Sequence, residues 1–186
     1  MTVKILFLAF IFFVSYSFVA AQTTKPFAEL DRQVKVQRGG FNGSKQPLAA
    51  AFNAERKRLG KQFETELLKY LGDDVEKHYW ISTFLEADSY LQGNAPLPHF
   101  SLLIKQQGLS LIENRTDEPS LFKVVSLSVT AAVLSEQLNF RALAKTHKAR
   151  AEDLIAKDDL YRAGFPAMNE AERKIYKAIE YKSASK

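Results

Sequence analysis

The chain has 186 residues, of which 46% are hydrophobic and 25% are charged, so it is long and apolar enough to bury the core of one globular domain. It contains no cysteine, which excludes a disulfide framework, a thiolate nucleophile and sulfur ligands for a metal. The formal net charge of +5 is modest and no nucleic-acid recognition module is visible, so a nucleic-acid partner is not expected.

The N-terminal residues 1–21 have the pattern of an export signal. A single basic residue, Lys4, precedes an apolar run, and the small residues that a signal peptidase requires are supplied by Val19 and Ala21. This pattern predicts a signal peptide that is cleaved between Ala21 and Gln22. The alternative is a retained membrane anchor, but the fully apolar part is shorter than the roughly 20 residues that a spanning helix needs.

Cleavage would leave an exported chain with no membrane span and with 25 basic and 21 acidic side chains, a net charge of +4. Because small secreted eukaryotic domains more often carry disulfide bonds, the absence of cysteine favours the bacterial periplasm or secretion from a bacterium. Two N-x-S/T sequons, at Asn42 and Asn114, favour a glycosylated product instead, although so short a pattern often arises by chance.

Residues 22–46 are polar, contain three glycines and show no sustained periodicity, so they predict a flexible N-terminal arm. The helical patterns begin at Pro47 and end near residue 182. We therefore expect one all-α domain over residues 47–182, followed by a short disordered tail over residues 183–186.

The first two helical patterns lie between Pro47 and Gln92. Apolar residues at a 3.6-residue period predict one long amphipathic helix from Pro47 to near Gly72, where a glycine can take a left-handed C-cap conformation. Asp73 or Asp74 is expected to cap a second helix from about Val75 to Gln92, which the glycine and prolines that follow would end. The apolar positions of the first helix are Leu48, Phe52, Leu59, Phe63 and Leu67.

A third helix is expected from His99 to about Glu113, with Phe100, Leu103, Ile104 and Leu111 on its apolar side. The fourth segment, residues 119–138, alternates apolar residues with serine or threonine as a strand would. We nevertheless predict a helix, because the segment is too long for a typical strand and has no second strand to pair with. It should be the most buried element, since it is nearly free of charge.

A fifth helix should follow a tight corner at Asn139, and a sixth is expected over residues 169–182, where Asn169 and Glu172 have capping-box spacing. About six helices joined by short connections predict a single compact all-α domain of helix-hairpin pairs. The sequence leaves open whether the pairs form a bundle or a short helical-repeat-like array.

Two ionisable residues are predicted to face the core. On a continuous second helix, Asp88 lies four residues after Phe84, near the middle of the apolar side. His147 is at the centre of the apolar stripe of the fifth helix, between Ala144 and Ala151. Because burying an unpaired charge is costly, Asp88 predicts hydrogen-bond partners on neighbouring helices.

Asp88 and His147 could form a general-base pair, as in a small hydrolase, or a metal site to which His78, His99 or Glu86 adds ligands. No recognised metalloenzyme, nucleophile or phosphate-loop motif supports either hypothesis, so we expect no cofactor. The alternative is that each residue is satisfied separately within the core.

Two surface hypotheses remain. The side chains opposite Phe84 on the second helix could line a groove for a peptide, a glycan or another helix; they are Tyr79, Glu86 and Tyr90. The basic cluster could bind an anionic membrane or cell-wall polymer, or it could be a solvated helix face; it consists of Arg56, Lys57, Arg58 and Lys61. The sequence as a whole favours an exported, non-catalytic helical domain that binds a protein or a cell-envelope partner.

Overall fold

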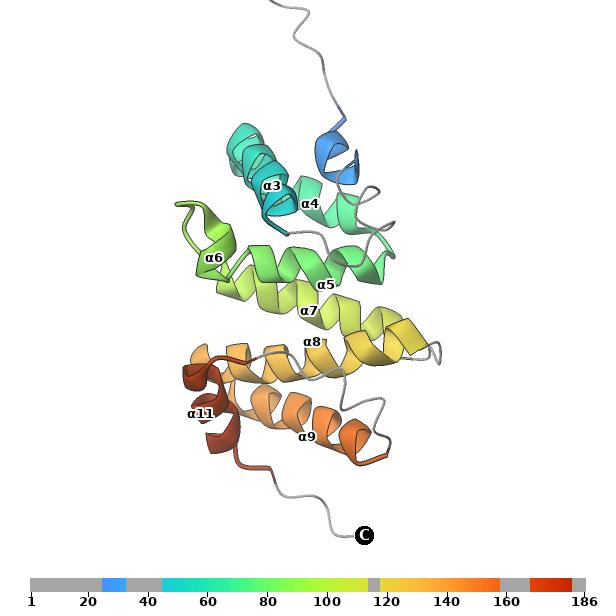
Figure 1. Ribbon diagram of the computed structural model, residues 1–186, viewed down its shortest axis with the longest axis vertical. Coiled ribbons are helices and arrows are strands. Elements are labelled where there is room, and N and C mark those ends of the chain that lie inside the picture. Colours follow the sequence, from blue (N-terminus) through green and yellow to red (C-terminus); the bar gives the residue numbers. More distant parts are fainter. Residues whose placement is uncertain (1–24, 33–44, 114–117, 158–167, 182–186) are drawn as a thin grey trace, which may run out of the picture.

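A computed structural model describes residues 25–32, 45–113, 118–157 and 168–181. Within these ranges every regular element is a helix and no strand occurs, as the sequence predicts (Figure 1). None of the described helices combines the length and the hydropathy needed to cross a membrane. The predicted signal peptide with its Ala21–Gln22 cleavage site, the sequons at Asn42 and Asn114, and the tail over residues 183–186 lie outside the described residues.

The helices form a layered stack, with the most extensive contacts inside two helix pairs, α5 with α7 and α8 with α9. Contacts between α7 and α8 join the two pairs, α3 and α4 cover one end of the stack, and α11 packs on α8 at the other end (Figure 1). The predicted single domain of helix-hairpin pairs is therefore confirmed. The elements are α3 (Gln46–Leu59), η1 (Gly60–Gln62), α4 (Phe63–Leu71), α5 (Val75–Phe84), α6 (Asp88–Leu91), α7 (Pro98–Ile112), α8 (Glu118–Gln137), α9 (Arg141–Lys157) and α11 (Glu170–Ala178).

The long helix predicted from Pro47 to Gly72 is interrupted at Gly60. This residue has φ +51°, a value that glycine adopts without a steric penalty, and its N–H donates to the carbonyl of Arg56 to end α3. The short turn η1 then redirects the chain into α4. As a result Phe52 and Phe63, from the two separate helices, meet with their ring centroids 5.4 Å apart.

The second predicted helix, Val75–Gln92, is also two helices. Its start is as expected, because the Asp74 carboxylate accepts hydrogen bonds from the backbone N–H groups of Glu76 and Lys77. However, α5 ends at Phe84, and a turn precedes the short helix α6. The carbonyl of Leu85 instead accepts a hydrogen bond from Leu97 N–H at 2.8 Å, so the returning chain satisfies the end of α5.

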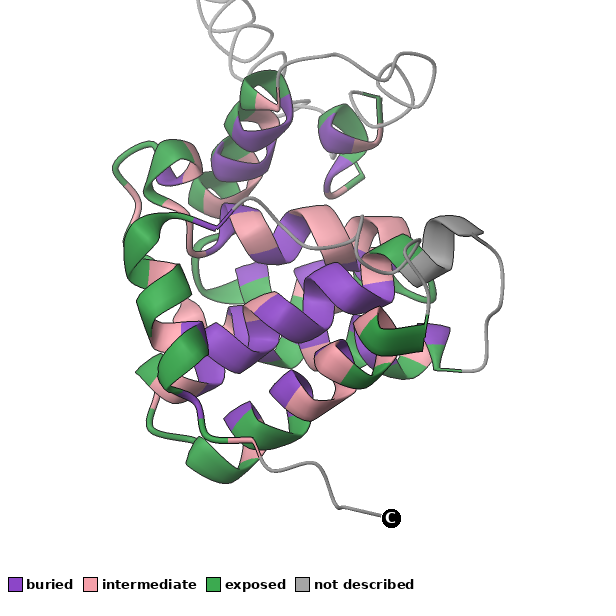
Figure 2. Cartoon of the chain, turned by 60° about the horizontal axis from the view of Figure 1, so that its bottom comes forward, coloured by how far each residue is buried: buried purple, intermediate pink, exposed green. Residues whose placement is uncertain are grey.

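Helix α8 is the most buried element, as predicted, since residues 124–129 and 131–135 are all buried. Figure 2 shows that buried residues concentrate on the helices in the middle of the stack. The alternating serine and threonine residues fit a helix because their hydroxyls bond to the preceding turn. Ser128 Oγ donates to the carbonyl of Val124 at 2.6 Å, and Thr130 Oγ1 donates to that of Ser126 at 3.0 Å.

The corner and the cap predicted for the C-terminal helices are both present. Asn139 has φ +63°, which asparagine tolerates better than most residues. In α11 the Asn169 side chain accepts from Glu172 N–H, and the Glu172 carboxylate accepts from Asn169 N–H, both at 2.9 Å. At the other end of α11, Lys148 Nζ donates to the carbonyl of Ile179 at 2.8 Å and holds this helix against α9.

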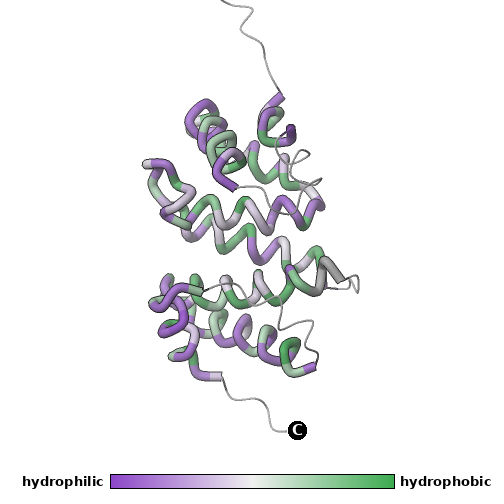
Figure 3. Tube along the Cα trace, viewed as in Figure 1, coloured by the Kyte–Doolittle hydropathy of each residue, from purple (hydrophilic) through white to green (hydrophobic). Residues whose placement is uncertain are grey.

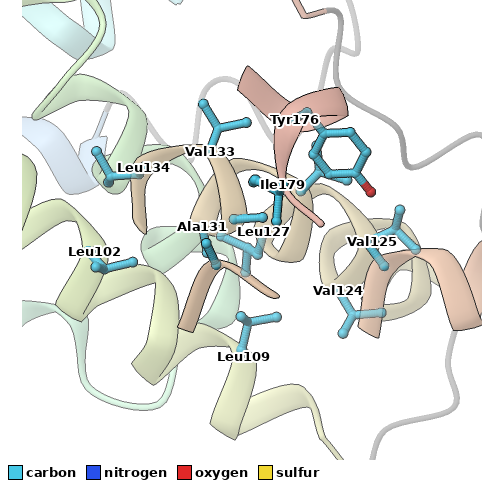
Figure 4. Packing of buried hydrophobic residues seen from close by; sticks show 14 of the residues in the cluster. Leu102, Leu109, Val124, Val125, Leu127, Ala131, Val133, Leu134, Tyr176 and Ile179 are labelled. Atoms are coloured by element: carbon cyan, nitrogen blue, oxygen red, sulfur yellow. The ribbon is translucent and has the colours of Figure 1, made fainter. Parts of the chain in front are cut away.

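Two clusters of buried apolar side chains fill the stack, and α5 and α7 contribute to both. Along the helices, polar residues alternate with apolar ones (Figure 3). In the C-terminal core, α8 side chains lie between Leu102 and Leu109 of α7 on one side and Tyr176 and Ile179 on the other (Figure 4). The N-terminal core consists of Phe27, Leu30, Leu48, Ala49, Phe52, Phe63, Leu67, Leu71, Ile81, Phe84, Leu85 and Ile104.

The arm predicted over residues 22–46 is wrong for residues 25–32. Phe27 and Leu30 are 0% exposed in the N-terminal core, and residues 28–32 form a helical turn. The polar and glycine-rich composition around them concealed two apolar anchors three residues apart, one directly before the helical turn and one within it.

The apolar side predicted for the third helix is rotated from the observed one. Leu103 is 41% exposed, whereas Ser101 and Gly108 are buried. A Cβ built on Gly108 would lie 3.0 Å from His78 Cβ on α5 and 3.3 Å from Leu127 Cδ1 on α8. Gly108 therefore lies at a close approach of α5, α7 and α8.

Gly108→Ala is expected to lower the free energy of unfolding. Overpacking a tight contact costs about 1–3 kcal/mol, which should outweigh the gain of about 1 kcal/mol from replacing a helical glycine by alanine. Ser110→Ala, at an exposed position of the same helix, is the matched control and should stabilise by up to about 0.5 kcal/mol. Urea unfolding of both variants measures the difference. A Gly108→Ala chain as stable as the control would show that the three helices are not in tight contact there.

Candidate functional site

Asp88 and His147, both predicted to face the core, do not meet in the structure. Asp88 is the first residue of α6 and is exposed, whereas His147 is buried on α9. Helices α7 and α8 separate α6 from α9 (Figure 1). The prediction for Asp88 was wrong because it assumed an unbroken helix, and the turn after Phe84 changes which way the following residues face.

His147 is a buried histidine of α9. Its side chain lies in the C-terminal half of the stack with the residue 7% exposed, and Nε2 has no hydrogen-bond partner among the described residues. Burial, aided by the charge of Arg150, lowers the pKa of His147 to about 4. The imidazole is therefore neutral near pH 7, but within the described ranges no carboxylate fixes its tautomer as a general-base pair requires.

The other two histidines lie in different surroundings. His78 is 2% exposed on α5, its Nδ1 donates to the carbonyl of Asp74 at 2.9 Å, and burial lowers its pKa. His99 is exposed at the start of α7, with its ring 5.9 Å from that of Phe140. In the part of the chain that the structure describes, no group of three or more histidine, aspartate or glutamate residues could hold a metal ion. The structure thus does not assemble a metal site from His78, His99 and His147.

The three residues of the groove hypothesis, Tyr79, Glu86 and Tyr90, each take part in a different contact. The Tyr79 hydroxyl accepts from Ser126 Oγ at 3.4 Å, and burial raises the pKa of this tyrosine. The ring of Tyr90 packs edge-on against Phe84 at 5.2 Å. Glu86 forms an ion pair with Lys105. Since the turn after Phe84 separates Tyr90 from α5, these side chains do not form one amphipathic wall.

The basic cluster of α3 and η1 is partly used within the fold. Arg56 Nη2 donates to the carbonyl of Ala95 at 2.7 Å, which holds the loop before α7 against α3. Arg58 pairs with Glu55 at 2.7 Å. Lys57 and Lys61 are exposed. Only these last two charges are directed to solvent without a role in the fold that the structure shows.

A buried polar cluster between α5 and α7 was not predicted. Lys105, 1% exposed, pairs with Glu86 at 2.8 Å and donates to Ser82 Oγ at 3.3 Å. Ser101 Oγ donates to the carbonyl of Ser82 at 2.8 Å, and Ser82 Oγ donates to that of Tyr79 at 3.1 Å. The small residues Ser101 and Gly108, seven apart in the sequence, were the available signal, because they mark the contact face of α7 and Lys105 lies between them.

A serine hydroxyl beside a lysine amine is the arrangement of a Ser–Lys nucleophile pair. Here, however, Ser82 is 0% exposed and the Lys105 amine is held by Glu86, so neither atom can reach a substrate. The cluster instead satisfies the polar groups that the close contact of α5 and α7 buries.

In the N-terminal core, residues 25–32 of the chain cover an apolar surface of α3, α4 and α5. We define the N-terminal groove as the surface of α3, α4 and α5 that covers Phe27 and Leu30. A small apolar hollow beside Leu30 has room for about one water molecule. Around Leu30 it is lined by Leu48, Tyr70, Glu76, Lys77, Trp80, Ile81 and Phe84.

Polar contacts accompany the two anchors in this groove. The N–H of Phe27 donates to the Glu55 carboxylate at 3.1 Å, and Asp31 lies 3.5 Å from Lys77 Nζ. Lys77 Nζ also lies 3.9 Å from the centre of the Tyr70 ring and donates to the Tyr70 carbonyl at 3.2 Å. The groove therefore combines an apolar floor with one acidic and one basic group at its edge.

No protein-family model, curated protein sequence or solved structure matches this chain. The arrangement of its own residues is thus the basis for a functional proposal.

The Lys105–Glu86 pair should respond unequally to the loss of each partner. Glu86→Ala leaves a buried ammonium without its carboxylate, which we expect to cost about 2 kcal/mol or more. Lys105→Met keeps the apolar stem and leaves Glu86, whose side chain is 23% exposed, in contact with water, so it should cost less than about 1 kcal/mol. Urea midpoints of both variants and of the double variant measure the coupling. Equal costs for the two single variants would mean that Lys105 is hydrated.

His147 should make the fold sensitive to acid. In the unfolded chain this histidine has a pKa near 6.5, whereas in the folded chain it is protonated only near pH 4. The stability that the neutral His147 contributes is therefore fully present above pH 6.5 and is lost as the pH falls. The loss should approach about 3 kcal/mol near pH 4 and be absent in His147→Leu, which at pH 7.5 should be neutral or stabilising. His78 contributes in the same direction in both chains. Urea unfolding from pH 7.5 to 4.5 measures how the free energy of unfolding depends on pH. His99→Leu, at an exposed ring, is the control. A His147→Leu chain with the same pH dependence as wild type would contradict the role given to His147.

Proposed function

We propose that this protein is an exported, non-catalytic helical domain that binds a protein partner through its N-terminal layer, α3 to α5. The observation that supports the proposal is the occupied N-terminal groove. A segment of eight residues, 25–32, is held there by two fully buried apolar side chains, Phe27 and Leu30, and by two polar contacts. This is the mode in which helical domains accept short amphipathic segments, with anchors three or four residues apart.

The placement of the chemically capable residues supports binding over catalysis. Asp88 and His147 lie on opposite sides of α7 and α8, and Ser82 and Lys105 are sealed between α5 and α7. A hydrolase needs its nucleophile or base beside an accessible cleft. Export is proposed from the signal-peptide pattern of residues 1–21, and the exported chain is expected to begin at Gln22.

Photocrosslinking in the cells that produce the protein tests this proposal. A benzophenone side chain in place of Trp80, which lines the groove, is expected to give a protein adduct of discrete mass on the exported chain that begins at Gln22. The same group in place of Lys174, which is 75% exposed on α11, is the matched control and should give none. Equal labelling at the two positions, or a chain that is not exported, would overturn the proposal.

The exposure of Lys57 and Lys61 favours a second candidate function, attachment to an anionic membrane or cell-wall surface. Two charges supply little affinity at physiological ionic strength, since such attraction is screened within about 8 Å. In the same experiment a benzophenone in place of Lys61 discriminates the two functions. Lipid or glycan adducts at this position, lost at high salt, would support the surface binder and contradict the protein-binding proposal.

A further inference from the structure

We infer that the N-terminal groove is a peptide-recognition site whose occupant in this structure, residues 25–32, is a replaceable copy of its true ligand. The inferred ligand is a short helical segment of a partner protein with the pattern Phe-x-x-Leu-Asp. This inference rests on the proposed function, because it names the partner chemistry of the same surface.

The two anchors define what the groove recognises. Phe27 is 0% exposed, stacks on the Tyr70 ring at 4.7 Å and contacts the Phe63 ring at 6.2 Å. Leu30, also 0% exposed, fills the remaining apolar space beside the small hollow. Buried aromatic and aliphatic anchors of this kind carry most of the binding energy of a peptide in a groove.

The polar contacts set the direction in which the segment lies. Glu55 accepts from the backbone N–H at the start of the helical turn, where the unpaired N–H groups of a helix favour a carboxylate. At the other end of the turn the acidic residue after the leucine, Asp31, faces Lys77. A segment bound in the reverse direction would lose both contacts, so the groove distinguishes the orientation of its ligand.

The occupant in this structure is strained, which makes it replaceable. Phe27 has φ +63°, a left-handed conformation that is costly for a bulky residue, on the order of 1–3 kcal/mol. A partner segment in which the phenylalanine lies in the first turn of a regular helix would keep an unpaired N–H for Glu55 without this cost.

Covalent attachment explains how a strained segment still fills the groove. Because the segment belongs to the same chain as its site, its binding is intramolecular, which corresponds to an effective concentration on the order of millimolar. A free peptide must compete with this concentration. The intact chain should therefore bind a partner segment, but more weakly than a chain whose own anchors are removed.

The test uses the full chain from Gln22 and a fluorescein-labelled peptide of residues 25–32 as the probe. Phe27→Ala with Leu30→Ala removes both anchors of the internal segment, and this chain should bind the probe at least about tenfold more tightly than wild type. Glu29→Ala is the matched control, because the Glu29 side chain is 51% exposed and faces Arg32, and it should bind like wild type. Fluorescence anisotropy measures all three affinities.

Variants of the probe check the pattern. Replacing its phenylalanine or its leucine by alanine should weaken binding to the double variant at least about tenfold, whereas replacing the glutamate should not. A double variant that is folded, by circular dichroism and cooperative urea unfolding, yet does not bind the probe would overturn the inference. If the double variant does not fold, a wild-type chain with a protease site placed within residues 38–43 and cut after folding takes its place, and failure of the probe to exchange into the cut chain overturns the inference.

Two further outcomes separate this inference from its alternatives. A wild-type chain that forms a concentration-dependent dimer, abolished by Phe27→Ala with Leu30→Ala, would assign the groove to the segment of a second copy and overturn the partner assignment. Probe binding without a protein adduct at Trp80 in cells would retain the groove as a peptide site and overturn the proposed function. An adduct at Trp80 without probe binding would retain the proposed function and overturn the peptide-recognition site.

Discussion

The close contact of α5 with α7 is the constraint on which the rest of the structure depends. Both hydrophobic cores include side chains of these two helices, so neither core can form unless the two helices are in register. The contact is close because α7 presents small residues, Ser101 and Gly108, to α5 and α8. Small side chains let helix backbones approach, but they leave little apolar surface to bury.

Polar groups fill the space that such a contact leaves. Ser82 and Ser101 are fully buried and bonded to backbone carbonyls, and Lys105 joins them to Glu86 at the solvent edge. A buried ion pair contributes little net stability, because desolvation offsets most of the attraction. Its consequence here is specificity, since a one-turn slip of α7 along α5 would leave the Lys105 amine buried without its carboxylate.

The sequence predicted the helices better than it predicted their faces. Caps are local, so Asp74, Asn139 and the Asn169–Glu172 box could be identified from neighbouring residues alone. The interruptions at Gly60 and after Phe84 could not, because an isolated glycine is tolerated within a helix and the second break is stabilised by a hydrogen bond from distant Leu97.

Each misplaced site residue follows from one of these nonlocal causes. The break after Phe84 moved Asp88 from the expected core to the surface. Lys105 was missed because its partners belong to another helix and a lysine is seldom buried. By contrast, His147 was correctly placed on the buried side of its helix, since α9 is unbroken from Arg141 to Lys157 and its apolar stripe keeps one phase throughout.

The two ends of the stack are closed in physically different ways, and this difference agrees with the partner site proposed at the N-terminal end. At the C-terminal end α11 is a capped helix, and the carbonyl of Ile179 is bonded to Lys148 of α9. At the other end, which α3 and α4 cover, the outermost helical turn, residues 28–32, is preceded by the anchor Phe27 in a strained backbone conformation. An element with few contacts and stored strain opens at a lower free energy than the rest of the fold. That opening would expose an apolar surface already shaped for two anchors. For this reason the partner site is proposed there and not at a buried polar cluster of the described helices.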